Sequence, residues 1–117
     1  MRWKLTERAG PKVSRSSFED AAGALDALEA RARELAGSAP REAVDARIRR
    51  FEPHQRVIAR LEVSGPERFI PSVRAGVDVH GDGSVEPFRG RVRREVVPTR
   101  RGESAYAALR RVLADRS

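Results

Sequence analysis

Hydrophobic and polar residues alternate with a period of two over several stretches of the chain. The alternation is clearest over residues 44–49, 57–63 and 73–79. Val77, for example, lies between Gly76 and Asp78. Successive side chains of a β-strand point to opposite faces of its sheet. Each stretch is therefore predicted to form a strand with one buried face and one face in water.

A fourth alternating stretch spans residues 88–96 and follows the turn signal His80-Gly81-Asp82-Gly83. Asp-Gly favours the left-handed conformations of tight hairpin turns, which predicts that 73–79 and 88–96 are paired. The residues expected to face the core are Phe88, Gly90, Val92 and Val96, and those expected to face water are Arg89, Arg91, Arg93 and Glu95. Near the start of the chain, Trp3–Thr6 and Lys12–Arg15 flank Gly10-Pro11. That pattern fits either a hairpin or one irregular edge strand.

Two segments have helical rather than strand periodicity. Over residues 19–36, leucines and alanines recur three or four positions apart, and residues 103–114 repeat the pattern. Ser16 with Glu19, or Ser17 with Asp20, can form a capping box at the start of the first helix. Gly37 is expected just beyond its end.

These elements predict an α+β fold in a single domain over residues 1–117, in the order β(β)-α-β-β-β-β-α. The sheet is expected to be antiparallel, with four to six strands. Two amphipathic helices can cover one face of such a sheet and leave the other in water.

The uncovered face of the sheet is expected to carry many of the basic residues of the chain. The chain has a net charge of +7, and 22 of its 24 basic residues are arginines. Residues 89–101 alone hold six arginines and one acid. Arginine suits planar recognition of phosphate, although a GC-rich genome would produce the same preference for arginine over lysine. Arg56, Arg60 and Arg74 are expected on the uncovered face with the arginines of the other alternating strands.

The candidate site is therefore an arginine-rich sheet face with a basic loop beside it. Its predicted residues are Arg47, Arg49, Arg60, Arg74, Arg89, Arg91, Arg93, Arg100 and Arg101. Such a face can follow a nucleic-acid backbone through salt-dependent contacts. The outward positions offer no aromatic ring for base stacking, so RNA or DNA would be bound by backbone or shape. The alternative is a protein-interaction or assembly module whose face is only solvated and paired with its own acids, Asp45, Glu62, Asp78 and Glu95. An acidic protein stays open as a partner, and the oligomeric state is left open.

No catalytic group, cofactor motif or metal site is predicted. The chain has no cysteine, and its two histidines, His54 and His80, lie far apart in presumed turns. An enzyme is therefore not expected. No apolar run reaches the roughly 18 residues of a membrane span, and the first residues lack the apolar core of a signal peptide. A cytoplasmic bacterial protein is the expectation.

The segment Glu103-Ser104-Ala105-Tyr106-Ala107-Ala108-Leu109, taken with the order of elements, loosely resembles ribosome-hibernation factors. That family has a β-α-β-β-β-α domain with an acid and a tyrosine early in its last helix. Its basic patch lies largely on helices, whereas the patch predicted here lies on a sheet. The resemblance implies topology and no function.

Overall fold

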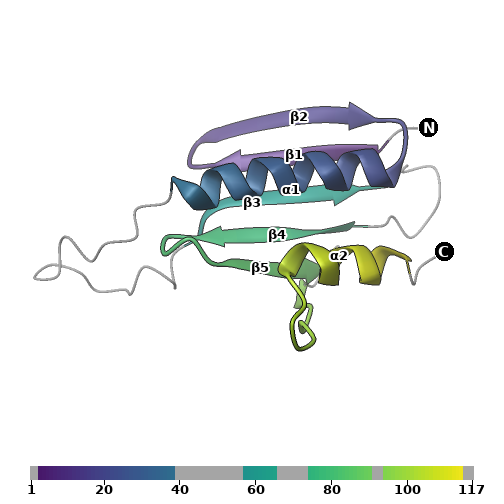
Figure 1. Cartoon of the computed structure of the whole chain (residues 1–117). Coiled ribbons are helices and arrows are strands. Elements are labelled where there is room, and N and C mark those ends of the chain that lie inside the picture. The colour runs from purple at the N-terminus through teal and green to yellow at the C-terminus, as the bar shows by residue number, and fades with distance from the viewer. Residues whose placement is uncertain (1–2, 39–56, 66–73, 91–93, 115–117) are drawn as a thin grey trace, which may run out of the picture.

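The computed structural model describes residues 3–38, 57–65, 74–90 and 94–114. They form one six-stranded antiparallel sheet with strand order β2-β1-β3-β4-β5-β6, and two helices (Figure 1). The elements are β1 (Trp3–Ala9), β2 (Lys12–Phe18), α1 (Ala21–Gly37), β3 (Val57–Ser64), β4 (Arg74–His80), β5 (Val85–Arg89), β6 (Glu95–Val96) and α2 (Ala105–Ala114). The predicted α+β class is confirmed. The strand predicted over 44–49 lies outside the described residues.

The chain begins with a hairpin rather than a single irregular strand. All seven residues of β1 pair with β2 in unbroken register, from Trp3 opposite Phe18 to Ala9 opposite Lys12. The two-residue loop is Gly10-Pro11, and Gly10 has a φ of +61°. This left-handed conformation is one that glycine adopts at little cost.

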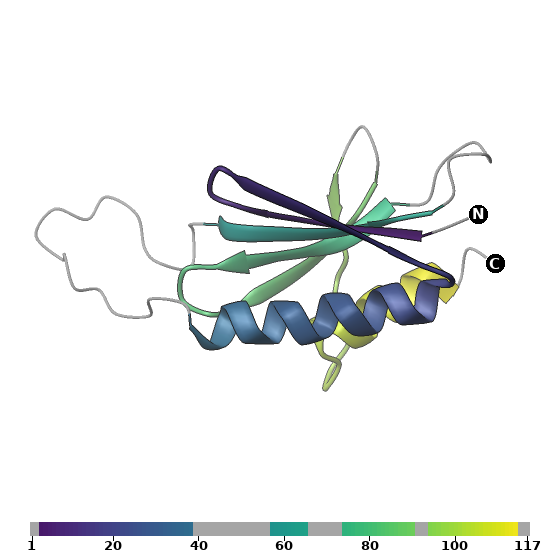
Figure 2. The same cartoon turned by 90° about the horizontal axis from the view of Figure 1, so that it is seen from above.

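Both helices lie on the same face of the sheet (Figure 2). The alternate residues Leu61, Val63, Val77 and Val79 are fully buried on this face. Leu25 and Leu28 of α1, with Leu109 and Leu113 of α2, belong to the same core cluster. The alternation of the central strands therefore marks the buried face as predicted.

The first helix begins and ends slightly later than predicted. Its N-cap is Asp20, whose carboxylate accepts a hydrogen bond from the Gly23 N–H at 2.8 Å. Neither serine of the predicted capping boxes caps the helix, because both lie in β2. Gly37 is the last helical residue, and Ser38 is the C-cap. An aspartate that lies directly before the helix reaches its free N–H groups without a serine.

The arginine-rich segment after the His80–Gly83 turn is not one strand. The turn itself is confirmed, with the Gly83 N–H bonded to the His80 carbonyl at 2.9 Å. β5, however, ends at Arg89, and Gly90 has a φ of +118°. β6 then pairs antiparallel with β5, with Glu95 opposite Arg89. The single strand predicted over 88–96 is therefore wrong, because the chain reverses within it.

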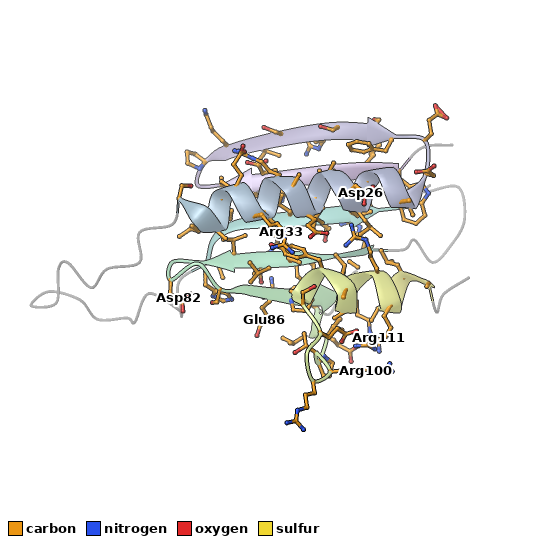
Figure 3. The ribbon with its side chains drawn as sticks, in the orientation of Figure 1. Asp26, Arg33, Asp82, Glu86, Arg100 and Arg111 are labelled. Carbon is orange, nitrogen blue, oxygen red and sulfur yellow. The ribbon has the colours of Figure 1, made fainter. Side chains whose placement is uncertain are left out.

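Charged side chains join the two helices across their outer surface. Arg110 of α2 binds Glu29 at 2.7 Å and Asp26 at 2.8 Å. Arg33 of α1 lies over the Tyr106 ring, 4.7 Å from its centroid (Figure 3). Hydrogen bonds from Arg110, which has the larger effect, and from Arg33 hold the pKa of Glu29 below its usual value. Neither helix is long and apolar enough to cross a membrane, within the part of the chain described.

Candidate anion-binding face

The candidate site is the sheet face turned away from α1 and α2, here called the open face. No described helix or strand lies across it (Figure 2). Strand registers place side chains on this face in rows, such as Arg8, Arg60, Asp78 and Glu86 across β1, β3, β4 and β5. Its described charged residues are Lys4, Arg8, Arg15, Arg60, Arg74, Arg94, Glu62, Asp78 and Glu86. Six bases against three acids leave an excess of +3.

The positive charge is concentrated on the β1–β2 hairpin. The open face of this hairpin carries Lys4, Thr6, Arg8, Arg15 and Ser17, which we call the hairpin patch. Arg15 lies opposite Thr6, diagonal to both Lys4 and Arg8. Diagonal neighbours on paired strands lie about 7–8 Å apart, which is close enough for three cations to contact adjacent phosphates.

The three cations of the hairpin patch are exposed, and they make no ion pair within the described residues. The acid of the same hairpin, Glu7, points to the opposite face. There it accepts two hydrogen bonds from Arg31 of α1, at 2.8 and 3.0 Å. The nearest acid across the sheet, Glu62, lies opposite Thr6 and contacts Arg74 at 3.5 Å. Within the part of the chain that the structure describes, no acid therefore neutralises the positive charge of the hairpin patch.

The arginines on the β3–β4 side of the open face have partners within the protein. Asp78 is only 2% exposed, and its carboxylate contacts Arg60 at 2.8 Å and Arg94 at 3.2 Å. Both guanidinium groups also lie over the Phe88 ring, 5.7 and 5.2 Å from its centroid. A buried carboxylate needs such partners, because an unpaired charge away from water is very costly. This half of the open face is thus largely self-neutralised.

Phe88 differs from its predicted placement. It is 2% exposed, as expected for a core residue, but it lies opposite Gly76 on the open face. Arg60 and Arg94 cover it there. The prediction that it faces the core with the inward residues of β4 is wrong. The register between β4 and β5 places it opposite Gly76, which alternates with those inward residues.

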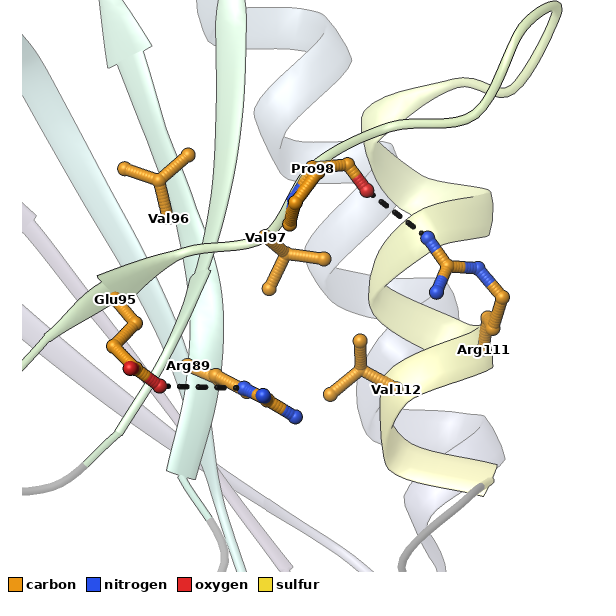
Figure 4. Close-up of a pocket in the computed structure, with 7 residues that line it drawn as sticks. All are labelled: Arg89, Glu95, Val96, Val97, Pro98, Arg111 and Val112. Atoms are coloured by element: carbon orange, nitrogen blue, oxygen red, sulfur yellow. Dashed lines mark hydrogen bonds and ion pairs between the residues drawn. The ribbon is translucent and has the colours of Figure 1, made fainter.

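Arg89 is likewise on the other side of the sheet from its predicted position. It lies opposite Ala75, whose side chain is in the core on the helix face. Its guanidinium contacts Glu95 at 3.7 Å at the rim of a pocket of about 210 Å³ (Figure 4). Val97 and Val112 line the same pocket, and Arg111 donates a hydrogen bond to the Pro98 carbonyl there. Arg89 therefore cannot act together with Arg60 and Arg74 on one surface.

The remaining predicted residues divide into two groups. Arg100 and Arg101 are exposed in the loop before α2, which extends on the helix side of the sheet (Figures 2 and 3). Arg47, Arg49, Arg91 and Arg93 lie outside the described residues. Of the nine predicted positions, the structure brings Arg60 and Arg74 together on the open face.

The loop before α2 is fixed by an acid rather than left free. Glu103 binds Arg111 at 2.9 and 3.0 Å and accepts a hydrogen bond from the Arg100 N–H at 2.8 Å. These contacts, with Arg111 the stronger, lower the pKa of Glu103 to about 2. The acid and tyrosine noted in this segment thus have structural contacts, since Tyr106 is buried beneath Arg33.

The sequence did offer a signal for the hairpin patch. Lys4, Thr6 and Arg8 alternate with Trp3, Leu5 and Ala9, the same period used for the other strands. Glu7 concealed it, because a charged residue on the buried side breaks the apolar alternation. Its partner Arg31 lies 24 positions away on a helix, which no local pattern reveals.

No metal cluster of three or more His, Cys, Asp or Glu side chains occurs among the described residues. His80 lies 3.9 Å from Glu86. No family model, curated protein or solved structure matches the chain. The resemblance noted for residues 103–109 therefore stays an analogy, and function has to be argued from the open face.

Proposed function

We propose that this protein is a non-catalytic module that binds the sugar–phosphate backbone of nucleic acid, RNA or DNA, through the hairpin patch. The observation that carries the proposal is the group of three exposed cations, Lys4, Arg8 and Arg15, with no ion pair in the described part of the chain. Protein contacts to phosphate come mainly from Arg and Lys, with Ser and Thr hydroxyls adding hydrogen bonds. The hairpin patch supplies all of these groups.

The composition of the patch also supports one mode of binding. No aromatic side chain of the described strands lies among the cations, so these strands offer bases no ring on which to stack. Binding is then electrostatic and weakly dependent on sequence. A strand places alternate side chains about 7 Å apart, so Lys4, Thr6 and Arg8 span roughly 13 Å along β1. That length suits two or three consecutive phosphates.

The direct test is titration of fluorescein-labelled single-stranded RNA with the protein at about 50 and about 200 mM salt. Three phosphate contacts to single-stranded RNA predict a loss of affinity of about 20-fold between these concentrations. The variant Lys4→Ala/Arg8→Ala/Arg15→Ala should abolish most of the binding at low salt. Absence of binding by the unchanged protein at low salt would refute the proposal.

A charge-matched control separates the patch from net charge. Lys12→Ala/Arg100→Ala/Arg101→Ala also removes three cations. Lys12 lies on the helix face of the same hairpin, opposite Ala9, and the two arginines lie in the loop before α2. This control should bind RNA nearly as well as the unchanged protein. Equal losses in both triple variants would show that overall charge, and not the hairpin patch, accounts for binding.

A further inference from the structure

The edge strand β2 exposes a long, regular row of backbone groups. Among the described strands it lies at the edge of the sheet and pairs only with β1, in register over all seven residues and without a bulge. Residues 12–17 are all exposed. The opposite edge, β6, has only two residues. Proteins protect sheet edges by shortness, bulges, proline or charged side chains, and of these β2 has only the charges of Lys12 and Arg15.

The hairpin geometry indicates which groups face outward. A two-residue loop is normally closed by a hydrogen-bonded pair, here Ala9 and Lys12, and such pairs alternate with non-bonded pairs along an antiparallel ladder. Val13, Arg15 and Ser17 are therefore expected to direct their N–H and C=O groups away from β1. These groups are the ones that an added strand would pair with.

The charge beside this edge selects the chemistry of the added strand. Arg15 lies on the open face of β2 and Lys12 on its helix face, so either face of a new strand would meet a cation. Arg8 lies directly behind Val13 on the open face. The one acid of the hairpin strands, Glu7, is held by Arg31. Opposite charges placed directly across paired strands stabilise the pairing, whereas like charges oppose it.

We propose that β2 captures an extended acidic polypeptide segment, which adds to the sheet as a seventh, antiparallel strand. The segment would place acids opposite Arg15 and Lys12 and an apolar residue opposite Val13, a residue that is 42% exposed. Because the added strand runs antiparallel to β2, its sequence from the N- to the C-terminus is an acid, any residue, an apolar residue and an acid. The proposal concerns the backbone edge and does not depend on RNA binding by the hairpin patch.

The test uses the synthetic peptide Thr-Thr-Thr-Glu-Thr-Val-Glu, capped at both ends and labelled with fluorescein, with anisotropy as the readout. Val13→Pro removes one outward N–H and leaves every charge in place. Proline is tolerated in an edge strand where its missing N–H would face solvent. Val13→Ala is the matched control, since it loses the same apolar side chain but keeps the N–H. Circular dichroism and thermal melting of both variants establish that each remains folded.

The peptide should bind the unchanged protein and the Val13→Ala variant, and Val13→Pro should weaken binding about tenfold relative to Val13→Ala. Replacing the valine of the peptide by proline should weaken binding similarly. Equal binding by the two folded variants would overturn the proposal, because charge alone would then hold the peptide. Failure of the unchanged protein to bind the peptide, or its self-association through β2 in light scattering, would overturn it as well. Both variants should bind RNA normally, so this result and the test of the proposed function are independent.

Discussion

At the scale of single residues, Asp78 shows how the open face can hold arginines without leaving them free. Its carboxylate is buried between Arg60 and Arg94, and the two guanidinium groups share the Phe88 ring. Arg60 was predicted as a binding residue, and its position on the open face is as expected. Its contacts indicate that it contributes to stability more than to binding an outside anion.

This arrangement predicts a non-additive effect on stability. Arg60→Ala or Arg94→Ala alone leaves Asp78 with one cation and should cost about 1–2 kcal/mol, because the arginines are partly exposed and solvent screens them. The double variant leaves a buried, unpaired carboxylate and should cost about 3–5 kcal/mol. Urea denaturation of the three variants measures both values. A loss of stability in the double variant that does not exceed the sum of the two single losses would contradict the shared role.

Glu103 gives a second prediction at this scale. Its pKa of about 2 lies below the value near 4.3 expected in the unfolded chain. Its stabilising contribution is therefore complete above about pH 4.3 and is lost as the pH falls toward 2. An NMR titration of the Glu103 side-chain carboxyl carbon should give a midpoint close to 2. A midpoint near 4 would show that the contacts to Arg111 and the Arg100 N–H do not hold in solution.

At the scale of elements, the pairing of β3 with β4 depends on a glycine. A Cβ at Gly76 would lie 2.0 Å from the Leu61 carbonyl oxygen and 2.8 Å from the Glu62 Cα. Both are backbone atoms, so the strands would have to separate. Gly76→Ala is expected to destabilise the protein by at least about 2–3 kcal/mol.

Gly37, the last residue of α1, provides the control for this prediction. A Cβ there would meet no atom within 4 Å. Gly37→Ala is therefore expected to stabilise the protein slightly, by about 0.5–1 kcal/mol, because alanine favours the helix. Thermal unfolding of the two variants should shift in opposite directions. A Gly76→Ala variant as stable as the unchanged protein would show that β3 and β4 are not paired as described.

The elements were more predictable than the site built on them. Strands β3 and β4 and both helices follow from local periodicity, because their buried residues recur at the spacing of a strand or a helix. The reversal between β5 and β6 could not be read this way. An arginine-rich run that alternates with Gly90 and Val92 looks the same whether it continues or turns back, and the positive φ of Gly90 becomes apparent only in three dimensions. The faces of Phe88 and Arg89 were mistaken for a different reason, because they depend on the register between β4 and β5, which places these residues opposite Gly76 and Ala75.

At the scale of the whole molecule, the sheet separates two kinds of surface. One face is covered by α1 and α2 and holds the core. The open face is self-neutralised along β3 and β4, but its β1–β2 hairpin carries cations that pair with no acid among the described residues, next to an exposed edge strand. The centre of the candidate site thus lies in residues 4–17 and not in the predicted segment 89–101.

The salt dependence of RNA binding tests this central claim most directly. The logarithm of the association constant should fall linearly with the logarithm of salt concentration, with a slope near −0.7 for each phosphate contacted on single-stranded RNA. Removing Lys4, Arg8 and Arg15 should reduce the magnitude of the slope by roughly 2, whereas the Lys12/Arg100/Arg101 control should leave it almost unchanged. A slope that is the same in the unchanged protein and the hairpin-patch variant would contradict the claim that these three side chains contact the backbone.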